Sequence, residues 1–323
     1  MKTRDVIIVG GGPGGSTAAW ELRKQGIDCL ILERDEFPRL KLCGGWITPQ
    51  VLRDLQLAPA DYPHSLVSFE KLRIHLRGVT LSIPTLQHSI RRIEFDHWLL
   101  QRSGAEVVRH EVKDIRRENG LYILDDRFQC NYLIGAGGTR CPVYRRFFRE
   151  RHPRPKQLQV VAQEQEFAYD WQDRHCHLWF FDQGLPGYAW YVPKGNGYLN
   201  VGIGGMAAKL KQRQDGIKPH WQRFSGRLRQ SGLVAKGDWD AGGYSYYLRD
   251  RVDVIRRDNS LLVGDAAGLA TRDMCEGIGP AIRSGLLAAR AVASGESYRL
   301  DTVSPYTIGR RLLNRTLDYL YTH

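Results

Sequence analysis

The stretch DVIIVGGGPGG, residues 5–15, decides the fold of the N-terminal part of the chain. Its apolar run from Val6 to Val9 predicts a short strand that is buried on both faces of a parallel sheet. The residues from Ser16 to Gln25 have helical spacing, and Gly26 ends that helix before a second apolar run, Cys29 to Leu32. Strand, glycine-rich turn, helix and strand together predict one βαβ unit.

The glycines of this turn have the spacing G-x-G-x-x-G of a dinucleotide-binding site. Gly10 permits the tight turn, Gly12 lets the backbone approach a pyrophosphate, and Gly15 lets helix and strand pack closely. The helix N-terminus then offers N–H groups to the phosphates. Glu33, at the end of the second strand, can accept hydrogen bonds from the ribose hydroxyls, and its charge disfavours the 2′-phosphate of NADP at this site. The turn therefore predicts a bound dinucleotide, either NAD or FAD.

Length and composition fit one large or two ordinary globular domains, because 323 residues with 42% hydrophobic side chains can bury a sizeable core. The six cysteines are scattered and form no CxxC pair, which predicts free thiols in a reducing compartment. No apolar run approaches the roughly 18–20 residues that span a bilayer. We therefore expect a cytoplasmic protein that contacts a membrane at most peripherally.

The formal net charge of +12 and the pI near 9.5 allow three interpretations. A solvated basic face would keep the protein soluble, whereas the anionic inner face of a membrane would attract the basic residues. We expect no nucleic-acid partner, because no helix-turn-helix, zinc-finger or RNP-like pattern accompanies the charge. One basic patch comprises Arg145, Arg146, Arg149, Arg151 and Arg154.

The alternation of helices and strands expected of an α/β domain continues to about residue 155. It is interrupted by a strand-rich segment and returns near residue 260. We expect, in order, a helix at 94–102, strands at 106–109, 112–117, 121–124 and 132–135, and a hairpin turn at Asn119-Gly120. From Pro155 to about Leu248, alternating aromatic-rich segments predict an antiparallel sheet, which Leu72 to Ile83 joins. A strand at 260–264, a helix at 279–293 and a last helix at 305–321 follow.

The nucleotide-binding domain is therefore expected to be discontinuous, with the β-rich domain inserted into it. The expected domains are residues 1–70, 88–155 and 250–300 for nucleotide binding, residues 71–87 and 156–249 for the substrate, and residues 301–323 for a C-terminal helix.

Two further motifs favour FAD over NAD. The segment LVGDAAG, residues 262–268, resembles the second FAD signature of the flavoprotein hydroxylase and reductase superfamily, in which Asp265 would bind the ribityl hydroxyls. The nearby EGIGPA, residues 276–281, would place a helix N-terminus under the flavin pyrimidine, where its dipole stabilises the anionic reduced ring. The segment RIEFDHWL, residues 92–99, matches the R-x-x-F-D-x-x-L helix of that superfamily and implies that Arg92 lies near the cofactor. Considered without the resemblance, Asp96 in this helix would be a surface charge.

On these motifs the chain resembles the geranylgeranyl reductase family of FAD-dependent oxidoreductases. Two more segments carry the likeness: KLCGG, residues 41–45, is similar to the segment that passes beside the isoalloxazine ring in these reductases, and GYAWYVPKG, residues 187–195, is similar to a strand that lines their substrate cavity. The resemblance implies an α/β fold with an FAD-binding Rossmann-type domain, of the glutathione reductase and p-hydroxybenzoate hydroxylase type, and an inserted antiparallel β-sheet substrate domain.

The resemblance also implies reduction of C=C bonds in an isoprenoid or similar apolar or lipid substrate, with NADPH or another reductant as electron donor. Cys43 is expected to act as proton donor or gate, unless it is only a small buried side chain. Tyr188 and Trp190 lie two apart on one strand face and would form an aromatic wall, or an ordinary sheet core. In all, we expect FAD to contact Gly10, Gly12, Pro13, Gly14, Gly15, Ser16, Glu33, Arg34, Cys43, Gly44, Arg92, Val112, Asp265, Gly277, Ile278 and Gly279.

Two departures from the family pattern keep other functions open. Gly137 stands where hydroxylases and many reductases have an acid, and the C-terminal region is short for the family. The alternatives are an aromatic monooxygenase or halogenase-like enzyme, an electron-transfer flavoprotein that reduces a quinone, and a binding protein with a vestigial FAD site. A metal site at His175 and His177 is not expected, because the sequence shows no third ligand.

Overall fold

The computed structural model describes residues 1–235 and 239–308, and these form two compact units. Of the described residues, the first unit comprises Met1–Arg39, Ile93–Pro155 and residues 247–308, and the second comprises Leu40–Arg92 and Lys156–Tyr246. The second unit thus begins at Leu40, earlier than the expected residue 71. The reason is that β3 (Trp46–Ile47) and β4 (Val67–Leu76) both pair with β5 (Val79–Ser89) in the sheet of the second unit.

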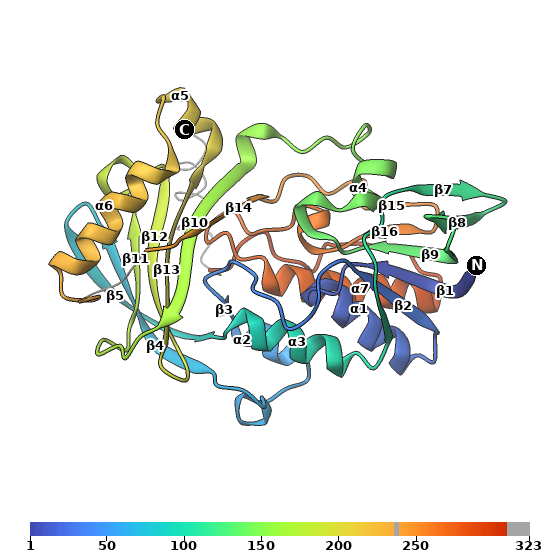
Figure 1. Ribbon diagram of the computed structural model, residues 1–323, viewed down its shortest axis with the longest axis horizontal. Coiled ribbons are helices and arrows are strands. Elements are labelled where there is room, and N and C mark those ends of the chain that lie inside the picture. The colour runs from blue at the N-terminus through green and yellow to red at the C-terminus, as the bar shows by residue number, and fades with distance from the viewer. Residues whose placement is uncertain (236–238, 309–323) are drawn as a thin grey trace. The chain divides into compact units, whose positions relative to one another are not determined.

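The first unit is built on an eight-stranded sheet whose central strands are parallel (Figure 1). In spatial order its main path runs through β15 (Arg256–Arg257), β16 (Ser260–Leu262), β9 (Phe128–Gly135), β1 (Lys2–Val9), β2 (Cys29–Glu33) and β6 (Glu106–Arg109), and β7 (Ile115–Glu118) and β8 (Leu121–Leu124) extend from β9. The pairs from β16 to β6 are parallel, and the other pairs are antiparallel.

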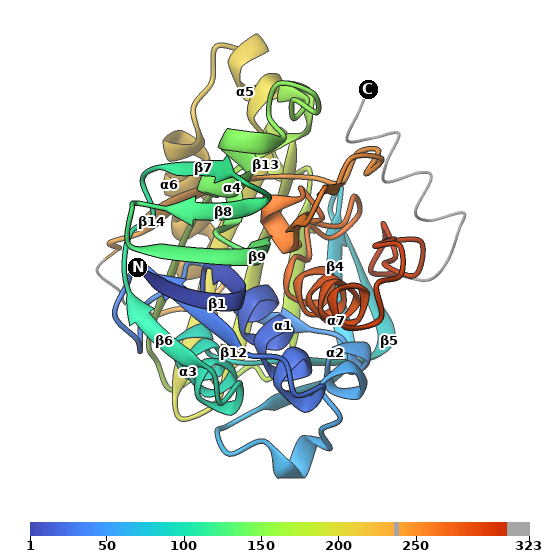
Figure 2. The same ribbon diagram turned by 90° about the vertical axis from the view of Figure 1, so that its right-hand side faces the viewer.

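Both faces of this sheet are covered, as the sequence predicted for a parallel sheet. Val6 and Ile8 face a core that includes residues of α1 (Pro13–Lys24) and α7 (Ile278–Ser294), which lie side by side in Figure 2. Ile7 and Val9 face the opposite core, which residues of β7, β8 and α4 (Pro142–Phe147) complete. The unit is therefore a Rossmann-type α/β domain, and the predicted βαβ unit forms its centre.

The expected helix at 94–102 is α3 (Arg92–Arg102), and its first residue, Arg92, falls in the second unit. The hairpin turn at Asn119-Gly120 joins β7 to β8 with φ angles of 50° and 85°, which a two-residue turn of this hand requires. The strand expected at 112–117 begins later, at Ile115. Of the helix expected at 305–321, residues 309–321 lie outside the described residues, and residues 305–308 are not helical.

The second unit is built on another eight-stranded sheet, largely antiparallel, with β4 and β11 as a parallel pair (Figure 1). Its strand order is β14 (Gly242–Tyr247), β10 (Gln159–Ala168), β13 (Tyr198–Met206), β12 (Gly187–Lys194), β11 (Cys176–Phe180), β4, β5 and β3. The segment expected to join this sheet, residues 72–83, does so as parts of two strands, β4 and β5, with a turn at Arg77-Gly78. The expected inserted sheet is present.

One face of this sheet is covered by α6 (Ile217–Gln230), whose Trp221 and Phe224 pack against Trp179 and Tyr191 in one core. Figure 1 shows α6 lying across β11, β12 and β13. This helix and the short α5 (Ala207–Gln212) fall where only strands were expected. The helix α2 (Pro49–Asp54) is also in this unit. Within the described residues, no helix is both long and apolar enough to cross a membrane.

Candidate functional site

Of the three motif glycines in the turn between β1 and α1, two have no room for a side chain, and the third, Gly12, has free space beside it. A Cβ on Gly10, where φ is +112°, would lie 2.5 Å from the oxygen of Ala136, and one on Gly15 would lie 1.9 Å from the oxygen of Gly10. At Gly12, in contrast, the nearest atom to a Cβ is Nη2 of Arg39 at 3.7 Å. The turn therefore leaves room at the N-terminus of α1, where helix N–H groups attract a phosphate.

Glu33 ends β2 directly beside this turn. Its Oε2 accepts a hydrogen bond from the Gly11 N–H at 2.6 Å, and its Oε1 accepts one from the Asp35 N–H at 2.9 Å. The carboxylate is thus held in one orientation against the turn. Ser16, in the first turn of α1, donates to the oxygen of Gly11 at 2.8 Å and fixes the turn from the other side. These contacts agree with a cradle for a dinucleotide.

Two other expected contact residues differ in their exposure to solvent. Arg34 is exposed, and its Nε lies 3.5 Å from a carboxylate oxygen of Asp35. Val112 follows β6 and is buried in the same core as Leu32. A cofactor contact at Val112 would therefore involve its backbone.

The cradle also contains an ion pair that the sequence did not identify. Nη2 of Arg39, the atom nearest to a Cβ on Gly12, lies 3.7 Å from Oδ2 of Asp96, and Asp96 is fully buried. The interpretation of Asp96 as a surface charge is therefore wrong, because α3 turns this residue into the unit. Asp96 orients a guanidinium toward the turn, where it can bind a pyrophosphate. The expected contact residue Arg92 is also buried, at the start of α3.

Asp265 and the N-terminus of α7, both expected at the FAD site, lie close together. Asp265 lies in a short 3₁₀ turn, Gly264–Ala266, and a Cβ on Gly277 would lie 3.2 Å from its Oδ1. Gly277 precedes the first residue of α7, Ile278. A carboxylate and the positive end of a helix dipole are therefore available side by side.

Glu276 adds a second carboxyl group at this helix N-terminus. It accepts a hydrogen bond from the Gly279 N–H, and burial raises its pKa to about 7, with Asp273 and Asp265 contributing in the same direction. Its motif was identified from the sequence, but its burial and its high pKa were not. The group can take up or release a proton near neutral pH.

Arg154, a member of the basic patch in the sequence, is half-buried and makes hydrogen bonds within the first unit. Its guanidinium donates to the oxygens of Thr139 and Ala266, at 2.6 and 2.7 Å, and lies 3.8 Å from the centre of the Tyr144 ring. Arg154 thus ties the loop after β9, which contains Gly137, to the segment that carries Asp265.

In the second unit, the expected residues Cys43, Gly44 and Trp190 lie together. A Cβ on Gly44 would lie 3.4 Å from Nε1 of Trp190, and the Gly45 N–H points at the Cys43 sulfur, 3.4 Å away. Cys43 is a free and partly exposed thiol. Tyr188 and Trp190 share one face of β12, with ring centres 5.8 Å apart. The thiol-bearing loop therefore packs on the aromatic face, which is the face opposite α6.

Two buried polar residues anchor this loop, and neither was identified from the sequence as a site residue. Lys194 is fully buried, and its ammonium donates to the oxygens of Gly44 and Ile90. Burial lowers its pKa to about 8. Asn200 donates to the oxygen of Cys43 at 3.4 Å and accepts from Nε1 of Trp190 at 2.7 Å. The loop is thus held at both Cys43 and Gly44.

Glu164, on β10, completes this polar cluster. Its carboxyl group accepts hydrogen bonds from Asn200 and from the Cys43 backbone, yet burial raises its pKa to about 7. A signal for it exists in the sequence, because Glu164 follows Val160 and Ala162 in the alternation of residues that point to the buried side of β10. A second group that titrates near neutral pH therefore lies beside Cys43.

His175 and His177 do share a third residue, contrary to the sequence-based expectation. Oδ1 of Asp173 lies 2.7 Å from Nδ1 of His175, and Oδ2 lies 3.0 Å from Nε2 of His177, so these groups could hold a metal ion. Each imidazole can instead donate its N–H to the carboxylate, which satisfies all three groups. Arg73 also stands opposite His177 in the neighbouring strand and opposes a bound cation. The absence of a metal stays a prediction.

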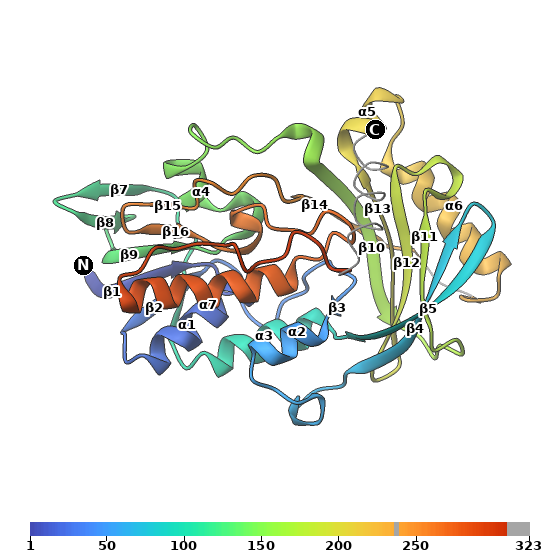
Figure 3. The ribbon, with the colours of Figure 1, turned by 180° about the vertical axis from the view of Figure 1, so that it is seen from behind.

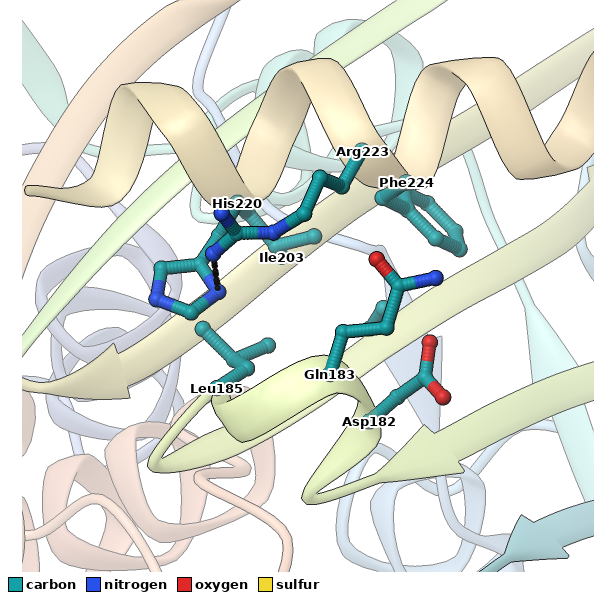
Figure 4. A pocket seen from close by; sticks show the side chains of 8 residues that line it. Asp182, Gln183, Leu185, Ile203, His220, Arg223 and Phe224 are labelled. Carbon is teal, nitrogen blue, oxygen red and sulfur yellow. Dashed lines mark hydrogen bonds between the residues drawn. The ribbon is translucent and has the colours of Figure 1, made fainter. Parts of the chain in front are cut away.

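A small pocket lies under α6, on the sheet face opposite Trp190 (Figure 4). It is lined by Asp182, Gln183, Leu185, Ala189, Ile203, His220, Arg223 and Phe224. Arg223 donates to Nδ1 of His220 at 2.8 Å, and Nε2 of His220 lies 2.7 Å from Asp215. Because these polar groups satisfy one another and none contacts the Cys43 loop, we do not include this pocket in the candidate site.

Comparisons with known proteins agree with this architecture. Residues 8–67 match a family model described as an NAD(P)-binding Rossmann-like domain. The chain is similar over 99% of its length to the crystal structure of a geranylgeranyl bacteriochlorophyll reductase-like protein from Thermoplasma acidophilum, with a TM-score of 0.79, 23% identity and 83% of that chain covered.

Three relatives are similar in sequence over most of their length. An uncharacterised protein of Methanosarcina barkeri is 31% identical, over 91% of this chain and 76% of its own. The menaquinone reductase of Mycolicibacterium smegmatis is 29% identical, over 91% of this chain and 78% of its own. Digeranylgeranylglycerophospholipid reductase 3 of Methanosphaera stadtmanae is 28% identical, over 100% of this chain and 84% of its own.

Proposed function

The chain belongs to the geranylgeranyl reductase family of FAD-dependent oxidoreductases, and from this premise we propose that it reduces C=C bonds of an isoprenoid or similar apolar substrate. When bound and reduced, FAD supplies a hydride to one carbon of the double bond, and the protein must supply a proton to the other. NADPH or another reductant would return the cofactor to its reduced state.

The residues of the first unit fit FAD. The open position at Gly12, with Arg39 beside it, suits the pyrophosphate. The fixed carboxylate of Glu33 suits ribose hydroxyls, and Asp265 beside Gly277 suits the ribityl hydroxyls. These roles are proposals that rest on the cradle geometry and on the family resemblance.

The residues of the second unit suit an apolar substrate and a proton donor. Tyr188 and Trp190 offer aromatic surface, and Cys43 precedes Gly44, which packs against Trp190, on the loop that the family resemblance places beside the flavin. Glu164, whose pKa burial raises to about 7, contacts the Cys43 backbone and can restore a proton to this region after each turnover. The observation that carries the proposal is the packing of the Cys43–Gly44 loop on Trp190.

A transient-kinetic experiment tests this role of Cys43. The reduced protein is mixed without oxygen with an isoprenoid lipid, and reoxidation of the flavin is followed by absorbance. We expect Cys43→Ala to slow this step at least about tenfold while flavin reduction is little changed, and Cys43→Ser, which keeps an O–H donor, to recover part of the rate. Equal losses in both half-reactions for Cys43→Ala would contradict the proposal.

The reduction of a quinone is a second candidate, because one of the relatives is a menaquinone reductase. The product distinguishes the two reactions. A quinol is reoxidised by air to the starting quinone, whereas a saturated C–C bond survives exposure to air. An isoprenoid quinone that loses its added hydrogens in air would therefore support the second candidate over the first.

A further inference from the structure

The β4–β5 hairpin of the second unit has one apolar and one polar face. The pairs that face one side are Leu72–Ile83, Ile74–Leu81 and Leu76–Val79, and the pairs between them are Arg73–Ser82 and His75–Thr80. The polar face lies on the α6 side, where the His75 ring stacks on Trp179 at 4.7 Å. The aliphatic residues therefore point to the other side of the sheet.

This apolar face becomes more exposed toward the tip of the hairpin. The exposed fraction is 4% at Leu72, 37% at Leu76, 49% at Leu81 and 58% at Val79. In the strand order, β5 lies next to the end of the sheet, and its outer edge is paired only at His88 and Ser89, with β3. Figure 3 shows the hairpin (cyan) at the side of the sheet away from β10. A clustered, exposed aliphatic surface of this kind marks a site of interaction.

The same face leads to the aromatic residues of the candidate site. Leu76 stands opposite Phe180 in β11, and Phe180 stands opposite Tyr188 in β12. The rings of Phe180 and Tyr188 are 5.2 Å apart, and Tyr188 adjoins Trp190. A continuous apolar face thus runs across four strands, buried at Trp190 and Phe180 and exposed at the tip.

The charge of the hairpin indicates what covers it. From Val67 to Ser89 the hairpin contains three Lys or Arg residues, Lys71, Arg73 and Arg77, and one acidic residue, Glu70, which lies in the half of β4 away from the tip. Lys71 and Arg77 are exposed, and Arg77 is at the tip. Aliphatic side chains flanked by basic ones fit a lipid surface that carries negative charge. A second copy of the chain fits less well, because a two-fold contact would bring the same basic residues together.

We propose that the β4–β5 hairpin docks on an anionic lipid bilayer, with Leu76, Val79 and Leu81 inserted among the lipids and Arg77 at the headgroups. The choice of lipid as the occupant rests in part on the proposed function, since an isoprenoid lipid would enter along the same apolar surface. The docking itself is measured without turnover, so a failure of docking and a failure of the proposed reaction are distinguishable.

The test is co-sedimentation of the full chain with vesicles of phosphatidylcholine alone and of phosphatidylcholine with phosphatidylglycerol. We expect binding that is stronger with the anionic vesicles and that the pair Val79→Ser and Leu81→Ser weakens at least about tenfold. Val107→Ser is the matched control, because Val107 is also an exposed valine but lies on β6 of the first unit. Arg77→Gln should weaken binding to the anionic vesicles only.

Three results would overturn the proposal. One is wild-type protein that stays in the supernatant with both vesicles, and another is a double variant that sediments like Val107→Ser. The third concerns a different occupant. If the free protein dimerises and the double variant does not, then a second copy of the chain rather than lipid covers this face. Circular dichroism of the double variant checks that it is folded.

Discussion

Replacement of Lys194 by Met removes the anchor of the Cys43 loop while keeping a side chain of similar length. The ammonium of Lys194 is the hydrogen-bond donor to the oxygens of Gly44 and Ile90, and both contacts are lost in the variant. Each unsatisfied buried carbonyl costs about 1–3 kcal/mol, and removal of a buried charge offsets part of this. We expect a net loss of about 2 kcal/mol at pH 7, which lowers Tm by about 4–8 °C.

The stability difference between the wild type and Lys194→Met should grow with pH. This dependence distinguishes an effect of the lysine charge from an effect of side-chain packing alone. The pKa of Lys194 is lowered by burial from 10.5 to about 8 in the folded protein. Between these two values the unfolded chain holds a proton that the folded chain lacks, so the wild type gains stability as the pH rises from about 8 toward 10.5. The variant has no such gain. The wild type therefore gains about 3 kcal/mol of stability over the variant across the whole range from about pH 8 to 10.5.

The assay is urea unfolding of both proteins from pH 7 to 10, together with the rate of substrate-dependent flavin reoxidation. Lys218→Met, an exposed lysine on α6, is the matched control and should behave like the wild type at every pH. The turnover of Lys194→Met should fall more than its flavin reduction. If Lys194→Met has the stability and turnover of the control, Lys194 does not anchor the Cys43 loop. If the loss of stability in Lys194→Met is the same at every pH, the pKa of Lys194 is not lowered.

Four other predictions have defined outcomes. Gly15→Ala should lose FAD and more than about 2 kcal/mol of stability, because its Cβ would lie 1.9 Å from the oxygen of Gly10. Gly226→Ala on α6 is the control, because no atom lies within 4 Å of its Cβ, and it should be neutral or stabilising by up to about 1 kcal/mol. Glu33→Arg should weaken FAD retention, and a variant that purifies with full yellow colour would count against the ribose assignment. The raised pKa of Glu164 stabilises the wild type only while this carboxyl group is protonated. The Glu164→Gln variant should therefore gain stability relative to the wild type as the pH rises from 4.5 to about 7, by about 3 kcal/mol at most. Unfolding free energies of the two proteins that run parallel with pH would disprove the raised pKa. Elemental analysis of the purified protein should find no stoichiometric metal at Asp173, and one bound ion per chain that Asp173→Asn removes would show otherwise.

Local patterns in the sequence were sufficient to predict the nucleotide-binding part of the fold. The apolar run before Gly10 and the glycine spacing act within a dozen residues, so strand, turn and helix follow from chemistry that lies close together in the chain. Asp265 and Gly277 are also close in the chain, because only the turns and loop of residues 266–276 separate them.

Contacts between distant segments were not predictable in this way. Asp96 meets Arg39, and Lys194 meets Gly44, across 57 and 150 residues of sequence, and no spacing rule links such positions. The helix α6 was also missed, although Trp221, Phe224 and Leu228 recur at helical spacing, because the aromatic residues around them favoured strands. The sequence thus identified the segments that form the candidate site but not the buried polar residues that hold them.

We propose that this protein saturates a C=C bond of an isoprenoid. The most direct test is mass spectrometry after incubation of the holoenzyme, a reductant and an isoprenoid lipid or quinone, with the products exposed to air before measurement. We predict a product that has gained two hydrogens and keeps them in air, and that does not form with Cys43→Ala at the wild-type rate. A substrate that returns to its original mass in air, or one that has gained oxygen, would contradict the account.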